Sequence, residues 1–167
     1  MFTLLNGQVA REVQADRIRA AEHHRLASSM KSARNTGTPE AAPAPRAPDL
    51  VEVAGASNAF RVGGVVEVGA TSAVGSGGRV VHLGDAYEQT REALKNVSRI
   101  LRTQGVDLDD VVRTRVFLKK TWQWEEVGRA HAEVFGSTRP VTTFVGAGAL
   151  IDPDALVQIE ATAVAKG

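Results

Sequence analysis

The last part of the chain, residues 140–165, constrains the fold most. It reads PVTTFVGAGALIDPDALVQIEATAVA: two strand-like runs joined by a turn at residues 151–154. The second run places one carboxylate, Glu160, among apolar and small neighbours. A carboxylate buried without a partner costs several kcal/mol or takes up a proton. Glu160 therefore predicts either an ion pair or a functional site on the last strand.

Size, charge and cysteine content exclude several classes of protein. The chain has 167 residues, which is enough for one domain with a real core. Its net charge of +1 gives no field that would attract nucleic acid or a membrane surface. Because there is no cysteine, disulfides, thiolate nucleophiles and Cys-ligated zinc are excluded. No apolar run approaches a membrane span, and charges come too early for a secretory signal, so we expect a cytoplasmic protein.

Composition divides the chain into three predicted parts. Four of the six prolines lie in residues 36–49, TGTPEAAPAPRAPD, which predicts a linker of polyproline character. Residues 1–35 before it show a thin apolar stripe at helical spacing. We expect there a helical appendage that docks on its own domain, associates with other copies or frays. Residues 50–167 form the predicted folded domain.

The domain begins with short β-prone runs and continues into a helix. The runs cover residues 50–54, 58–62 and 65–74, with glycine turns at 63–64 and 75–78. Asp85 is a good N-cap for the helix that follows, and Glu88 three residues on completes the pattern of a capping box. Gly105 is placed to end this helix.

A strand, a second helix and two more strands complete the domain. In the strand 111–118 we expect Val112, Thr114, Val116 and Leu118 on one face and Arg113, Arg115 and Phe117 on the other. Thr121 can cap the second helix, with Trp124 and His131 along its inner side and Gly136 at its end. This order predicts an α+β fold in which two helices cover one face of a single mixed sheet.

Several of these segments resemble the RidA/YjgF family of small imine and enamine deaminases. The segments are DAYEQTREALKNVSRILRTQGVDLDDVVRTRVFL, the helix ending in HAEVFG, and RPVTTFVGAGALIDPDALVQIEATAVA. The resemblance runs from about residue 60 to residue 165. It implies a chorismate-mutase-like (YjgF-like) fold and a homotrimer whose sheets form a central barrel. It also implies a small-molecule cleft at each subunit interface.

The resemblance also implies a set of pocket positions. In the family's archetype an arginine clamps the substrate carboxylate and a glutamate orients the attacking water. The glutamate falls on Glu160, but the arginine falls on Thr142. A cysteine falls on Phe144, an asparagine on Gly128 and a tyrosine near Ala56. One of these five residues is kept, so the chain resembles the arginine-lacking branch of the family.

Each charged residue near this pocket has two possible interpretations. Glu160 is a catalytic candidate, or it forms a salt bridge that holds strands or subunits together. Arg115 should share its sheet face and could replace the missing arginine, or it could simply pair with Glu160. Arg139 directly precedes Pro140, so we expect an extended residue that reaches an anion in the cleft or stays solvated.

The remaining candidates carry no fixed charge. His131 is either a core histidine bonded to backbone or, at the border of the cleft, an acid or base. Thr142, Thr143 and Phe144 are substrate-binding candidates on the strand beside the cleft, although threonine is also a common β-former. No cofactor is implied, and the spacing of the histidines predicts no metal site.

Two classes of function follow. The first is an enzyme, a deaminase-like hydrolase or tautomerase acting on a metabolite that bears a carbonyl or carboxylate group. The second is a non-catalytic trimer that binds a ligand or a protein partner. An open cleft lined by Arg115 and Glu160 would favour the enzyme, whereas a closed ion pair would favour binding or structure.

Overall fold

A computed structural model describes residues 53–166, so the predicted N-terminal helix and linker lie outside the described residues. Five strands form one sheet in the order β1-β2-β5-β3-β4. The strands are β1 (Ala59–Val62), β2 (Val65–Thr71), β3 (Val111–Leu118), β4 (Val141–Gly146) and β5 (Val157–Val164). The helices are α3 (Ala86–Thr103) and α4 (Trp124–Phe135), with 3-10 turns η1 (Leu108–Asp110) and η2 (Thr121–Gln123).

The sheet is mixed, as predicted. The pairs β1–β2, β2–β5 and β5–β3 are antiparallel, whereas β3 and β4 run parallel. The two closing strands of the sequence therefore do not pair with each other. The chain leaves β4 at the sheet edge and returns as β5 between β2 and β3. This central position gives Glu160 neighbours on both sides.

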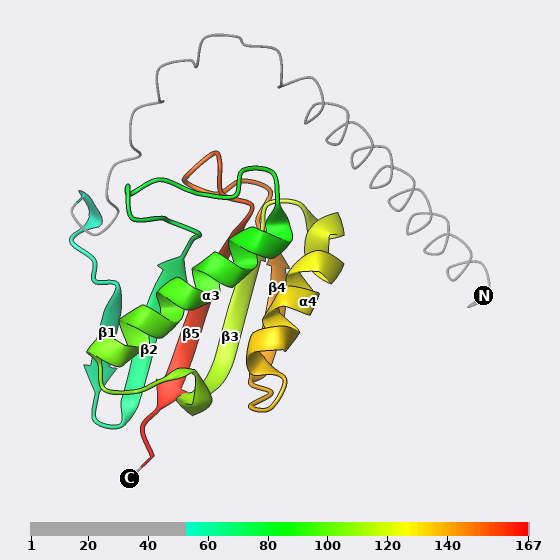
Figure 1. Ribbon diagram of the computed structural model, residues 1–167. Helices are drawn as coiled ribbons and strands as arrows, with labels where there is room; N and C mark the ends of the chain where they lie inside the picture. Colours follow the sequence, from blue (N-terminus) through cyan, green and yellow to red (C-terminus); the bar gives the residue numbers. More distant parts are fainter. Residues whose placement is uncertain (1–52, 167) are drawn as a thin grey trace, which may run out of the picture. The chain divides into compact units, whose positions relative to one another are not determined.

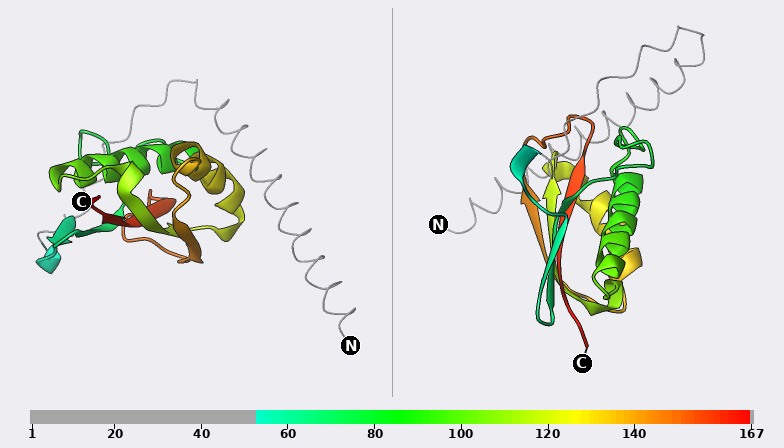
Figure 2. Two further views of the ribbon diagram at one scale, coloured as in Figure 1. Left: turned by 90° about the horizontal axis from the view of Figure 1, so that it is seen from below. Right: turned by 90° about the vertical axis from the view of Figure 1, so that its left-hand side faces the viewer.

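Both helices cover the same face of the sheet, which confirms the predicted α+β layer (Figures 1 and 2). Strand β5 shows the cause, because buried and partly exposed residues alternate along it. Val157, Ile159, Ala161 and Ala163 face the helices and meet Leu94 and Phe135 in the core. We call this side the helix face and the opposite side the open face. No helix among the described residues is long and apolar enough to cross a membrane.

The predicted ends of α3 are confirmed. The Asp85 side chain accepts a hydrogen bond from the Glu88 N–H at 3.0 Å. The Asp85 N–H donates to the His82 carbonyl at 3.1 Å, so the backbone makes the bond that a capping box assigns to the Glu88 side chain. Gly105 follows the helix with φ of 74°, which only glycine adopts without strain.

The predicted sidedness of Val112 was wrong. Val112 was expected on the buried face of the strand, but it is exposed and Val111 is buried instead. The cause is an irregularity in the β3–β5 register between Val111 and Arg113, where the strict alternation is interrupted. From Arg113 onward the predicted faces are correct.

Three other local predictions were also wrong. Thr121 does not cap the second helix, because η2 precedes it and Gln123 occupies the N-cap without a side-chain bond. Trp124 was expected on the inner side of that helix but is exposed. Of the β-prone run 50–54, the described residues Val53 and Ala54 are helical. None of these changes disturbs the layer, because the inner stripe of α4 still buries Val127, His131 and Phe135.

Candidate functional site

Glu160 and Arg115 meet on the open face. They lie opposite each other in the β3–β5 register, and Arg115 Nη1 donates to Glu160 Oε2 at 3.1 Å. The Arg115 side chain is 50% exposed and the Glu160 side chain 32% exposed. The predicted shared face and ion pair are confirmed. Exposed ion pairs contribute at most about 1 kcal/mol to folding, so stability alone is a weak reason for this one.

The hollow around the pair is small within one chain. It is lined by Glu67, Arg113, Arg115, Glu160, Ala161 and Thr162, and its cavity volume is about 10 Å³. That is room for roughly one water molecule and not for a metabolite. A substrate could reach Glu160 only if further walls stood above this face. The single chain thus presents a closed ion pair.

His131, Thr142 and Phe144 lie on the helix face instead. Thr142 is the register partner of the fully buried Thr114, and their Oγ1 atoms are 3.0 Å apart. Thr114 Oγ1 also lies 3.0 Å from His131 Nε2. One of the two interpretations of His131 was a core histidine bonded to the backbone; it is buried, but its bond is to the side chain of Thr114. The ring of His131 packs 4.7 Å from that of Phe135 and 6.4 Å from that of Phe144.

The hydrogens of this chain can be assigned from the donor count. Thr142 Oγ1–H donates to the Pro140 carbonyl at 3.0 Å, so its oxygen is left to accept from Thr114. Thr114 then accepts from His131 Nε2–H. His131 is 7% exposed, and burial lowers its pKa below the ordinary 6.5. His131 is therefore a neutral imidazole near neutral pH, tied to a buried hydroxyl.

Arg139 does not have the extended backbone that was predicted. Its φ is 48°, in the left-handed region, although a following proline disfavours helical conformations. Its N–H donates to the Phe135 carbonyl at 2.8 Å, which closes the turn between α4 and β4. Its Nε donates to the Gly136 carbonyl at 3.3 Å. In the described structure, Arg139 therefore stabilises this exposed turn through its two hydrogen bonds.

The predicted site residues thus divide between the two faces. Thr143 lies beside Arg115 on the open face, while Thr142 and Phe144 point the other way. An ideal Cβ on Gly128 would lie 3.9 Å from Phe144 Cζ, so these two positions lie side by side on α4 and β4. Glu160 is not with them in one chain. The positions carried over from the family do not form one pocket within a single copy.

Sequence reasoning missed three residues of this region. Thr114 was read as part of an apolar face, although a hydroxyl between valines signals a hydrogen-bonded core position. Glu67 and Thr162 flank the Arg115–Glu160 pair, and Thr162 Oγ1 donates to Glu67 Oε2 at 2.8 Å. Glu67 and Thr162 alternate with the buried residues of β2 and β5, and this pattern could have placed both side chains on the open face.

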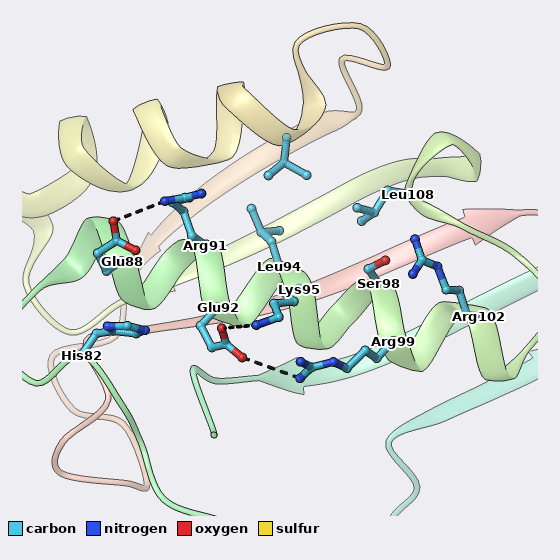
Figure 3. A pocket seen from close by; sticks show the side chains of 11 residues that line it. His82, Glu88, Arg91, Glu92, Leu94, Lys95, Ser98, Arg99, Arg102 and Leu108 are labelled. Carbon is cyan, nitrogen blue, oxygen red and sulfur yellow. Dashed lines mark hydrogen bonds and ion pairs between the residues drawn. The ribbon is translucent and has the colours of Figure 1, made fainter. Parts of the chain in front are cut away.

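A groove also lies elsewhere, on the outer side of α3 (Figure 3). It encloses about 550 Å³ and contains none of the predicted site residues. Its cations are held by carboxylates: Arg91 pairs with Glu88 at 3.4 Å, and Lys95 and Arg99 pair with Glu92 at 3.0 and 3.6 Å. It is a solvated helix face. In residues 53–166 no cluster of three or more histidines or carboxylates could hold a metal ion.

Comparison with known proteins places this geometry in a family. Residues 47–165 match the family model described as Endoribonuclease L-PSP. The chain is 34% identical over 125 residues to the 3-aminoacrylate deaminase RutC of Acinetobacter baylyi, covering 75% of this chain and 93% of that protein. The crystal structure of Rv2704 from Mycobacterium tuberculosis, a YjgF/YER057c/UK114 family member, matches with a TM-score of 0.62 and 41% identity. That match covers 71% of this chain and 94% of that chain.

The fold agrees with a further structure of the same group. The YjgF gene product of E. coli matches with a TM-score of 0.60 and 26% identity over 65% of this chain and 87% of that chain. The sheet with two helices on one face and the matched residues 47–165 lead to one conclusion. The chain belongs to the YjgF/RidA family.

Proposed function

We propose that this protein is a cytoplasmic homotrimer that hydrolyses an imine or enamine at the interface between its subunits. The observation that carries the proposal is the 34% identity to a 3-aminoacrylate deaminase over nearly the whole length of that enzyme. In such a reaction an enamine first moves a proton from nitrogen to carbon and becomes the imine. Water then adds to the carbon of the C=N bond, and the nitrogen leaves as ammonia. The product is the corresponding carbonyl compound.

Glu160 is the proposed catalytic residue. A carboxylate can take a proton from the attacking water or hold that water in place. Arg115, 3.1 Å away, would orient the carboxylate and attract an anionic group of the substrate. Because the hollow at this pair holds roughly one water, the substrate must be enclosed by residues of a neighbouring copy. Trimerisation is thus part of the proposed mechanism.

His131 takes a positioning role in this proposal. It is buried and neutral, and it bonds Thr114, which in turn bonds Thr142. It therefore acts on a ligand only through the orientation of the Thr142 hydroxyl. Thr142, Phe144 and the neighbouring Gly128 would line one wall of the interfacial cleft, and Thr143 and Arg139 would border it.

A second candidate is a non-catalytic trimer that binds a ligand or a protein partner. The closed contact between Arg115 and Glu160 favours it, because a paired carboxylate already has its hydrogen-bond partner. A nuclease, which the family description names, is not proposed. A net charge of +1 supplies no attraction for RNA, and phosphate contacts dominate nucleic-acid affinity.

Ammonia release tests the two candidates. The full-length protein is mixed with 3-aminoacrylate. Glu160→Gln keeps the size of the side chain but removes the base, so we expect at least about a 100-fold loss of rate with assembly unchanged. Glu125→Gln, on the exposed side of α4, is the matched control and should keep full activity. Full activity of Glu160→Gln would make the carboxylate structural and favour the second candidate.

A further inference from the structure

The open face carries an arginine whose charge the fold does not match. The strand registers place Phe60, Glu67, Thr162, Arg113 and Val141 side by side in one row across the sheet. The carboxylate of this row is turned to the hydroxyl, because Thr162 Oγ1 donates to Glu67 Oε2 at 2.8 Å. Arg113 makes no hydrogen bond or ion pair within residues 53–166, and no described helix covers it (Figure 2).

Arg113 lines the same hollow as the proposed catalytic residue, Glu160. In the β3–β5 register the two residues are diagonal neighbours, with a backbone separation of about 7 to 8 Å. Arg115 lines this hollow as well, but it is already bonded to Glu160 at 3.1 Å. Of the two guanidinium groups in this part of the described chain, Arg113 is therefore the one available to an anion.

The separation of Arg113 from Glu160 favours one arrangement of the anion and the reacting carbon. A guanidinium binds a carboxylate through two parallel N–H bonds, while the reacting carbon must lie beside the water at Glu160. In a 2-imino acid the carboxylate is bonded directly to the C=N carbon, so both groups would have to meet near one point. In 3-aminoacrylate, and in the imine that it forms, a further carbon separates them.

We propose that Arg113 binds the anionic group of the substrate, and that the substrate class is an imine or enamine whose carboxylate is at least one carbon away from the reacting carbon. This inference rests on the proposed function and deepens it. The two arginines thereby have separate tasks. Arg115 orients the carboxylate of Glu160, whereas Arg113 holds the substrate.

The preference for a charged over an uncharged substrate tests this assignment. The wild type, Arg113→Gln and Arg113→Lys, all full-length, are compared on 3-aminoacrylate and on its uncharged methyl ester, with ammonia release as the readout. We expect Arg113→Gln to lose roughly 10- to 100-fold in kcat/KM for the acid, mainly through KM, and to leave the ester unchanged. Arg113→Lys keeps the charge and should recover part of the loss. An equal loss on acid and ester would make Arg113 structural and overturn the inference.

The matched control is Arg99→Gln, which removes the same charge from the outer side of α3, away from the hollow. It should change neither the acid nor the ester rate. A loss of acid preference as large as that of Arg113→Gln would show that net charge, and not the position of Arg113, selects the anion.

Binding of a stable anion separates this inference from the function it rests on. The ion 3-hydroxypropanoate has the same spacing of carboxylate and third carbon but carries no C=N bond to hydrolyse. Its dissociation constant, measured by isothermal titration calorimetry, should rise roughly 10- to 100-fold in Arg113→Gln. With this rise but no ammonia release by the wild type, the proposed hydrolysis is wrong and the anion site stands. An affinity that is equal or absent in both proteins would overturn the anion site, whatever the activity.

Discussion

The two faces of the sheet satisfy their polar groups in different ways. On the helix face Thr114, His131 and Thr142 form a continuous hydrogen-bonded chain inside one copy, ending at the Pro140 carbonyl. On the open face Arg115 and Glu160 pair, but Arg113 has no partner within residues 53–166. The helix face is finished by the fold, whereas the open face leaves charges and apolar side chains to be matched from outside.

This difference shows where a function can reside. Buried polar groups need partners, and on the helix face the fold of one copy supplies them. Exposed charges carry no such requirement, so a patterned row of them beside Phe60 and Val141 calls for another explanation. The open face is therefore the surface on which assembly and chemistry are both proposed.

The largest contrast between the faces should be in stability. Ile159→Ala removes a fully buried side chain from the helix face and should cost about 2–5 kcal/mol of unfolding free energy. Val164→Ala on the same strand removes a side chain that is 41% exposed on the open face, and should cost well under half as much. Urea denaturation at one protein concentration compares them. Equal losses would show that the open face is buried as deeply as the core.

The next effect concerns substrate preference. Short 2-imino acids should be poor substrates, because Thr142 cannot form a bidentate contact with their carboxylate. Thr142→Arg should raise kcat/KM for them by roughly 10- to 100-fold, as hydrogen bonds to charged groups are worth about 1.5–3 kcal/mol. Thr103→Arg, at the exposed end of α3, is the matched control and should give no increase. An equal gain in both variants would contradict the assignment of Thr142 to the cleft wall.

A smaller effect is expected at the hydroxyl chain. Thr114→Val keeps the shape but leaves His131 Nε2–H without its acceptor, which should cost about 1–3 kcal/mol. Thr162→Val removes a hydroxyl from the partly exposed side and should cost less in the isolated subunit. Thermal unfolding measures both losses. A neutral Thr114→Val would show that His131 does not depend on this bond.

The smallest effect is a pH dependence of stability. Burial lowers the folded-state pKa of His131 below the ordinary 6.5, so the unfolded chain binds the proton more readily. The contribution of His131 to the free energy of unfolding should be fully present above about pH 6.5 and should decline as the pH falls from there toward the folded-state pKa. Backbone hydrogen bonds lower the pKa values of Asp107 and Asp110, whose contribution is lost only below 3.8. His131→Gln should flatten the slope of stability against pH just below pH 6.5, and an unchanged slope there would assign it to another group.

The sequence predicted the layer and the key pairing because both follow from alternation. The strict period of β5 put Glu160 opposite the core, and the same period in β3 put Arg115 beside it. The prediction from alternation was wrong at Val112, where the β3–β5 register shifts. The extended backbone predicted for Arg139 was also wrong, because the turn after α4 overrides the preference of a residue before proline.

The site was harder to predict than the fold. Motif carry-over assigned Glu160, Thr142 and Phe144 to one pocket, but within one copy the strand register places Glu160 on the open face and Thr142 and Phe144 on the helix face. Only strand order and register show that Thr142 lies with His131 and Thr143 with Arg115. No pattern in one chain states which surface a second copy brings to Glu160.

The mass of the wild-type protein in solution tests the central claim most directly, since the open face is proposed to be completed by other copies. Light scattering coupled to gel filtration, at micromolar concentration, should give three times the chain mass of 17.7 kDa. A stable monomer at that concentration would leave Glu160 in a hollow that holds roughly one water. Both the interfacial site and the proposed hydrolysis would then be wrong.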